Sequence, residues 1–135
     1  MTISTAVIDQ RGWFKFTLTG ANSAASAGLG QIANPEGVLL GITRAFIYAS
    51  TGSTGAANLD LGIGASGAKA SDICSAMSMV EADLGGDLTF LPAAQAAETD
   101  SPTALWAANT FLTFTGSADS TGLDADVYIE YIRLA

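Results

Sequence analysis

Short runs of alternating apolar and polar residues, separated by glycine- and serine-rich turns, limit what this chain can fold into. Over residues 14–18, phenylalanine and leucine alternate with lysine and threonine, and Thr19-Gly20 ends the run. A period of two is typical of a strand with one buried face, whereas an amphipathic helix repeats every 3.6 residues. This part of the chain therefore predicts a half-buried strand.

The pattern continues along the chain. Residues 38–50 form the longest run of β-branched and aromatic side chains, which predicts a central strand. The turn signal at 51–55 predicts that residues 59–63 pair with that strand as a hairpin. Further strands are expected at 110–115 and 126–134. Loops are expected between the strands, over 21–30, at Asn34-Pro35-Glu36-Gly37 and over 92–108.

The middle of the chain fits two patterns. Ile73, Met77, Val80 and Leu84 have the spacing of a helical stripe, whereas residues 73–80 also fit an extended segment of small residues. Both interpretations stay open here, and the surrounding strands favour the extended one.

These elements predict an all-β fold, an antiparallel β-sandwich with a jelly-roll-like arrangement. The length of 135 residues suits a single domain, 1–135, and a hydrophobic content of 49% supplies a core. Residues 1–10 are either the first strand of a sheet or an arm whose alternating side chains add to a neighbour's sheet edge.

Charge and composition argue against several functions. The chain has no histidine and only five basic residues against 13 acidic ones, which gives a net charge of −8. Such a chain repels phosphate backbones and anionic membranes, so we expect no direct nucleic-acid partner and no membrane partner. Without histidine, acid–base chemistry would need displaced carboxylate, tyrosine or lysine pKa values. No such constellation is visible, and we expect no enzyme, no catalytic residues and no cofactor.

The single cysteine, Cys74, allows no intrachain disulfide and has no histidine to activate it, so a small buried residue is expected there. No basic and apolar leader follows Met1, and no apolar run reaches the roughly 18 residues of a membrane-spanning helix. These features predict synthesis in a cytoplasm.

Four side chains are candidate interface residues. Arg44 stands in an apolar strand, where it either binds a partner's carboxylate or, as we expect first, pairs internally with Asp60 or Glu130. Trp13, Trp106 and Tyr48 are large aromatic residues of the kind that anchor interfaces. Packing in the core is the first expectation for each of these three aromatic residues.

Carboxylates offer two weaker hypotheses. Asp119, Asp124 and Asp126 lie close together in a glycine-containing loop, but their spacing does not match an EF-hand, and ordinary turn chemistry is expected instead of a metal site. The glutamates that a glycosidase would need, Glu81, Glu98 and Glu130, form no evident pair.

Several segments carry a resemblance to a known group. These segments are Asn34-Pro35-Glu36-Gly37, Leu39-Leu40-Gly41-Ile42-Thr43-Arg44, 53–62, Ser71-Asp72, 106–113 and Tyr128-Ile129-Glu130-Tyr131-Ile132. On these residues the chain resembles small virion proteins of tailed bacteriophages over most of its length after Ala27, and it departs from their pattern at residues 74–86.

The resemblance implies a jelly-roll decoration, or cement, protein on the capsid surface of a virion. It further implies binding to the major capsid protein, assembly as a homo-oligomer, most often a trimer, and synthesis in the host bacterial cytoplasm. A phage tail or tail-fibre component is the alternative within structural proteins. A carbohydrate-binding β-sandwich module is the alternative from another class, because sandwiches host many functions.

Overall fold

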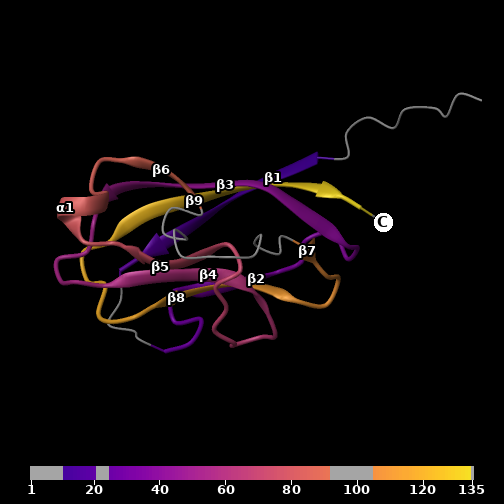
Figure 1. Ribbon diagram of the computed structural model, residues 1–135, viewed down its shortest axis with the longest axis horizontal. Coiled ribbons are helices and arrows are strands. Elements are labelled where there is room, and N and C mark those ends of the chain that lie inside the picture. The colour runs from indigo at the N-terminus through magenta and orange to yellow at the C-terminus, as the bar shows by residue number, and fades with distance from the viewer. Residues whose placement is uncertain (1–10, 21–24, 92–104, 135) are drawn as a thin grey trace, which may run out of the picture.

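The computed structural model describes residues 11–20, 25–91 and 105–134, and these form two antiparallel sheets packed face to face (Figure 1). The first sheet has the order β1-β9-β3-β6, with β7 pairing beside β3: β1 is Arg11–Thr19, β9 Asp124–Arg133, β3 Leu40–Thr51, β6 Leu88–Leu91 and β7 Leu105–Trp106. The second sheet has the order β2-β8-β4-β5: β2 is Gly30–Ala33, β8 Phe111–Gly116, β4 Asn58–Gly64 and β5 Cys74–Ser78. One helical turn, α1 (Glu81–Leu84), precedes β6.

The strand pairs are nested within one another. β4 pairs with β5, β3 with β6, β2 with β8 and β1 with β9, all antiparallel. In sequence, each pair encloses the one before it, from β4–β5 at the centre to β1–β9 at the outside, so the chain has the connectivity of one long hairpin folded across two sheets. This is a jelly-roll-like order. The predicted all-β, antiparallel β-sandwich is thereby confirmed.

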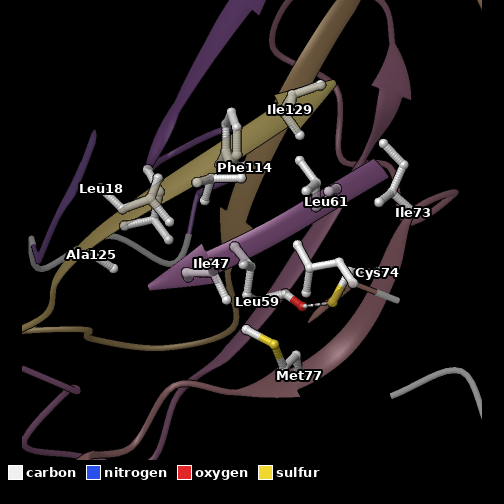
Figure 2. Packing of buried hydrophobic residues seen from close by; sticks show 14 of the residues in the cluster. Leu18, Ile47, Leu59, Leu61, Ile73, Cys74, Met77, Phe114, Ala125 and Ile129 are labelled. Atoms are coloured by element: carbon white, nitrogen blue, oxygen red, sulfur yellow. Dashed lines mark hydrogen bonds between the residues drawn. The ribbon is translucent and has the colours of Figure 1, made fainter. Parts of the chain in front are cut away.

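The core fills the space between the sheets. Alternation along β1 and β9 turns Leu18 and Ile129 inward, where they meet Leu61 and Phe114 of the second sheet (Figure 2). Phe16 stacks on Phe114 with ring centroids 4.4 Å apart. Cys74 is fully buried in the same cluster, as expected, and its Sγ lies 3.8 Å from the Leu59 carbonyl oxygen.

Loops of the chain itself close the outer face of the second sheet. A Cβ on Gly62 would lie 2.6 Å from the backbone of residues 70–72, so the β4–β5 loop rests directly on β4. Thr113 and Thr115 of β8 also face this side and are buried, and the Thr115 hydroxyl accepts a hydrogen bond from the Ala27 amide at 2.9 Å. The two central strands of the second sheet, β4 and β8, are therefore covered on this side.

The expected hairpin between residues 38–50 and 59–63 is wrong. β4 lies in the second sheet, between β8 and β5, and the connection crosses from one sheet to the other. Ser53 makes this crossing possible: its amide donates to the Met79 carbonyl at 2.7 Å, and its carbonyl accepts from the Glu81 amide at 3.0 Å. Long-range contacts with the segment before α1 thus replace a tight turn.

Other expectations divide. The strands predicted at 14–18, 38–50, 110–115 and 126–134 are confirmed as β1, β3, β8 and β9. The extended interpretation of the middle segment is confirmed by β5, and among the described residues α-helix is confined to α1. The short strands β2, β6 and β7 lie where no strand was predicted. The arm or first strand at residues 1–10, and residues 92–104 of the predicted loop, lie outside the described residues.

Leu61→Ala tests the assignment of the core. Leu61 is fully buried between the sheets, so truncation should lower the free energy of unfolding by about 2–5 kcal/mol. Denaturant unfolding measures this loss. Leu88→Ala is the matched control, because Leu88 is 54% exposed and its truncation should change stability by no more than about 0.5 kcal/mol. Equal losses in the two variants would contradict the packing described here.

Candidate interaction surface

The outer face of the first sheet carries a continuous group of large apolar side chains. The strand register places Lys15, Tyr128, Phe46 and Phe90 in one row across β1, β9, β3 and β6. The two neighbouring rows add Trp13 on one side, and Tyr48 with Leu88 on the other. We call this group the aromatic face; its members are Trp13, Phe46, Tyr48, Leu88, Phe90 and Tyr128.

Phe46 is the centre of the aromatic face. Its ring stacks on Tyr128 at a centroid distance of 5.0 Å and an interplanar angle of 17°. Trp13 meets it edge-on at 6.0 Å, and Phe90 lies tilted against it at 5.7 Å. The four rings form one packed unit that spans four strands.

Much of the aromatic face is open to solvent. Phe90 is 60% exposed, Trp13 48% and Tyr48 43%. An antiparallel sheet with one solvated face normally presents polar residues there, and contiguous exposed apolar patches mark interaction sites. Tryptophan, tyrosine and arginine are also the residue types most enriched at energetic centres of protein interfaces. The aromatic face therefore has the composition of a protein-binding surface.

A buried carboxylate organises the arginines beside the rings. Glu130 of β9 is only 4% exposed, and its Oε2 lies 3.5 Å from Arg44 Nη2 and 3.7 Å from Arg11 Nη1. Its Oε1 accepts a hydrogen bond from the Thr43 hydroxyl at 2.7 Å. The Arg44 guanidinium in turn lies 5.6 Å from the centroid of the Trp13 ring, within cation–π range.

A β-bulge makes this arrangement possible. The register shifts between Ile42, opposite Tyr131, and Arg44, opposite Glu130, so that Thr43 is an extra residue in β3. Bulges re-aim side chains locally. Here the bulge lets two consecutive residues, Thr43 and Arg44, reach the same carboxylate.

The predicted internal pair of Arg44 is confirmed with Glu130, while Asp60 instead pairs with Lys69 at 3.1 Å. Three of the four candidate interface residues, Trp13, Arg44 and Tyr48, lie on the same outer face. The expectation that Trp13 and Tyr48 pack in the core is wrong, because their positions in β1 and β3 point away from the second sheet.

Trp106 is different from the other three candidates. It is fully buried, its ring lies 5.9 Å from Phe14, and its Nε1 donates to the Thr110 carbonyl at 3.2 Å. Pairing of β7 with Leu40 of β3 holds it there. The core interpretation of Trp106 is thus confirmed, and its side chain is not exposed on the surface of this chain.

Sequence reasoning missed Phe46, Leu88, Phe90 and Tyr128. A signal was present in β3, where residues of both parities are apolar between 45 and 49, as expected for a strand covered on both faces. No such signal marks Leu88 and Phe90, because β6 has only four residues and was not recognised as a strand.

A second polar cluster ties the 34–37 turn to the end of β9. Arg133 donates to both carboxylate oxygens of Glu36, from Nε at 3.1 Å and Nη2 at 2.9 Å, and the Tyr131 hydroxyl donates to Glu36 Oε2 at 2.6 Å. The hydrogen bonds from Arg133 and then Tyr131 lower the pKa of Glu36. Burial, followed by the bond to Glu36, raises the pKa of Tyr131 to about 12. The cluster is a structural clamp, since its carboxylate is held charged and its phenol neutral.

The 119–126 carboxylates act in turns and strands. Asp119 accepts from the Thr121 hydroxyl and amide at 2.5 and 2.8 Å, which lowers its pKa, and Asp126 accepts from Thr17 at 2.8 Å. Within the part of the chain that the structure describes, no three histidine, cysteine, aspartate or glutamate side chains gather as metal ligands. Among the same residues, no helix has the length and apolar character to cross a membrane.

Comparison with known proteins gives one structural match. No family model matches the sequence, and no curated protein matches it. Among solved structures, a chain from the capsid of Ralstonia phage GP4 superimposes with a TM-score of 0.62 and 16% identity, over 100% of this chain and 92% of that chain. At this identity the likeness concerns the fold.

Glu36→Gln tests the clamp through pH. The lowered pKa of Glu36 means that its carboxylate stabilises the folded state above its usual value of 4.5, and that this contribution disappears as pH falls below 4.5 through the folded-state pKa. Wild type should therefore exceed the variant in unfolding free energy at neutral pH, with the difference shrinking in acid. Urea unfolding at a series of pH values measures it, and a difference independent of pH would contradict the clamp.

A double-mutant cycle tests the Arg44–Glu130 pair. Arg44→Ala should destabilise the wild-type protein more than it destabilises Glu130→Gln, with a coupling energy of about 1 kcal/mol, because the Arg44 side chain is 53% exposed and the attraction is partly screened. Lys15→Ala is the control: Lys15 has no ion-pair partner among the described residues, and its effect should be the same in both backgrounds. Additive effects at Arg44 would refute the pair.

Proposed function

We propose that this chain is a structural, non-enzymatic protein of a bacteriophage virion, a decoration or cement subunit that binds the outer surface of the shell. In this role it binds the major capsid protein, assembles as a homo-oligomer, with the trimer as the working hypothesis, and stabilises the capsid by bridging neighbouring shell subunits.

The observation that carries the proposal is the aromatic face. Six large apolar side chains gather on one sheet, four of them exposed and Phe46 and Tyr128 half-buried, while loops of the chain cover the central strands of the opposite sheet. A protein that acts alone gains nothing from this arrangement, whereas an assembly protein buries it against a neighbour. The fold of the Ralstonia phage GP4 capsid chain, matched over the whole length of this chain, supports the placement of that assembly in a capsid.

Ring geometry argues against a carbohydrate platform. Sugars stack on aromatic faces that are turned toward solvent. Here Phe46 and Tyr128 stack on each other, and Arg44 lies over the Trp13 ring. Phe46, Tyr128 and Trp13 thus already have a stacking partner within the chain, which favours a protein partner.

Quantitative mass spectrometry of purified phage particles tests the proposal. The copy number should be near that of the major capsid protein, because a decoration subunit covers the whole shell. Trp13→Ser combined with Phe90→Ser should reduce occupancy at least about tenfold, since large truncations at an interface centre cost about 2 kcal/mol or more.

Ala65→Ser is the control for this experiment. Ala65 is exposed in the loop over the second sheet, so the substitution should leave occupancy unchanged. A handful of copies per particle would move the protein to the tail, and its absence from particles would overturn the virion role.

A further inference from the structure

Charge is unevenly distributed over the sandwich. Loop 51–54, the α1 segment and loop 117–123 meet at one end: the Thr54 amide donates to the Thr121 carbonyl at 2.9 Å, and the Gly86 amide donates to the Ala49 carbonyl at 2.7 Å. Figure 1 shows this end, marked by α1, opposite the C-terminus. Five exposed carboxylates lie here, and we call them the acidic end: Glu81, Asp83, Asp87, Asp119 and Asp124.

The acidic end has no compensating cations. None of its carboxylates takes part in an ion pair within the described residues, where the four ion pairs use Glu36, Asp60 and Glu130 instead. Its negative charge is therefore available to a partner.

The basic residues gather elsewhere. Arg11, Lys15 and Arg44, three of the five in the chain, lie on the outer face of the first sheet around Trp13. One carboxylate, Glu130, serves both arginines, and Lys15 has no ion-pair partner among the described residues. The Trp13 side of the aromatic face thus carries surplus positive charge in a protein whose net charge is −8.

We propose that the aromatic face binds the acidic end of a second copy of this chain. The inference rests on the proposed function, since it names the partner of the surface on which that function depends. The two contacting surfaces differ, so the contact is head-to-tail, and repeated contacts of this kind close into a ring when the rotation between copies allows.

Electrostatics favours this partner over a face-to-face dimer. A face-to-face dimer whose twofold axis lies near Lys15 would bring Arg11, Lys15 and Arg44 close to their own symmetry mates, whereas the head-to-tail contact pairs opposite charges. The rings supply most of the affinity, because exposed charges are screened beyond about 8 Å at physiological salt. The charges select which surface of the second copy docks and in which orientation.

Charge reversal tests the contact on the purified full-length chain. Lys15→Glu alone, and Asp83→Lys with Asp87→Lys, should each weaken self-association about tenfold or more at low salt, measured by sedimentation velocity over a range of concentrations. Mixing the two variants should restore association. The aromatic face with Lys15→Glu then binds the end with Asp83→Lys and Asp87→Lys, and the unaltered aromatic face of one variant binds the unaltered acidic end of the other. Ala65→Lys with Ser66→Lys, in the exposed β4–β5 loop, adds positive charge away from both surfaces and should leave association unchanged.

Several results would overturn the inference. One is a wild-type chain that stays monomeric at every concentration. Another is a variant with Asp83→Lys and Asp87→Lys that associates like wild type, which would show that the acidic end takes no part in self-association. If that variant associates normally while the Trp13/Phe90 variant is lost from particles, the face binds a shell protein and the proposed function survives. If each charge-reversal variant loses association and the mixture regains it, but phage particles lack the chain, the head-to-tail contact is supported and the virion role is refuted.

Discussion

The pairing of β9 with both β1 and β3 is the constraint on which both sides of the first sheet depend. Val127 lies between Phe16 and Ile47 in one row of this register, and Tyr128 lies between Lys15 and Phe46 in the next. Because successive residues point to opposite sides, a slip of one residue would exchange the core row for the surface row. The ladder hydrogen bonds of β9 with β1 and β3 therefore place both the core residues on one side of the sheet and the aromatic face on the other.

Glu130 adds an electrostatic constraint to this register. Removing a carboxylate from water costs free energy unless charged or hydrogen-bonding partners compensate for the lost hydration. The partners of Glu130 come from both neighbouring strands. The bulge at Thr43 brings a hydroxyl and a guanidinium to the same group. The result fixes Arg44 over Trp13, so that part of the face is ordered before any partner arrives.

Much of the fold could be predicted from local pattern, and the site only in part. Long alternating runs identified β1, β3, β8 and β9, because period two is a local property of a half-buried strand. The hairpin between β3 and β4 failed since Gly and Ser at 52–53 fit a tight turn equally well, and only the contacts with Met79 and Glu81 decide the crossing. Such contacts between distant segments have no local signature.

The site shows the same division. Arg44 was a recognisable candidate because a cation in an apolar strand needs a partner, and Glu130 is that partner. Trp13 and Trp106 carry the same chemical signal, yet one is on the surface and the other in the core. The difference depends on which strand β7 pairs with and on which alternate residues of β1 face the core. Both are properties of the assembled sandwich. Phe90 entered the site through a strand too short to predict.

The strength of the aromatic face also bears on its biological use. Burying a half-exposed large apolar side chain against a partner contributes on the order of 1 kcal/mol of binding free energy. The six side chains of the aromatic face together therefore roughly offset the about 4–15 kcal/mol of translational and rotational freedom that association costs. One isolated contact of this kind is weak and forms in solution only at high concentrations of the chain. Repeated contacts on a regular lattice convert the same surface into stable attachment, because each additional contact is made at high effective concentration. A surface this apolar yet this small is therefore better suited to a subunit of a repeating array than to a protein that binds one partner once.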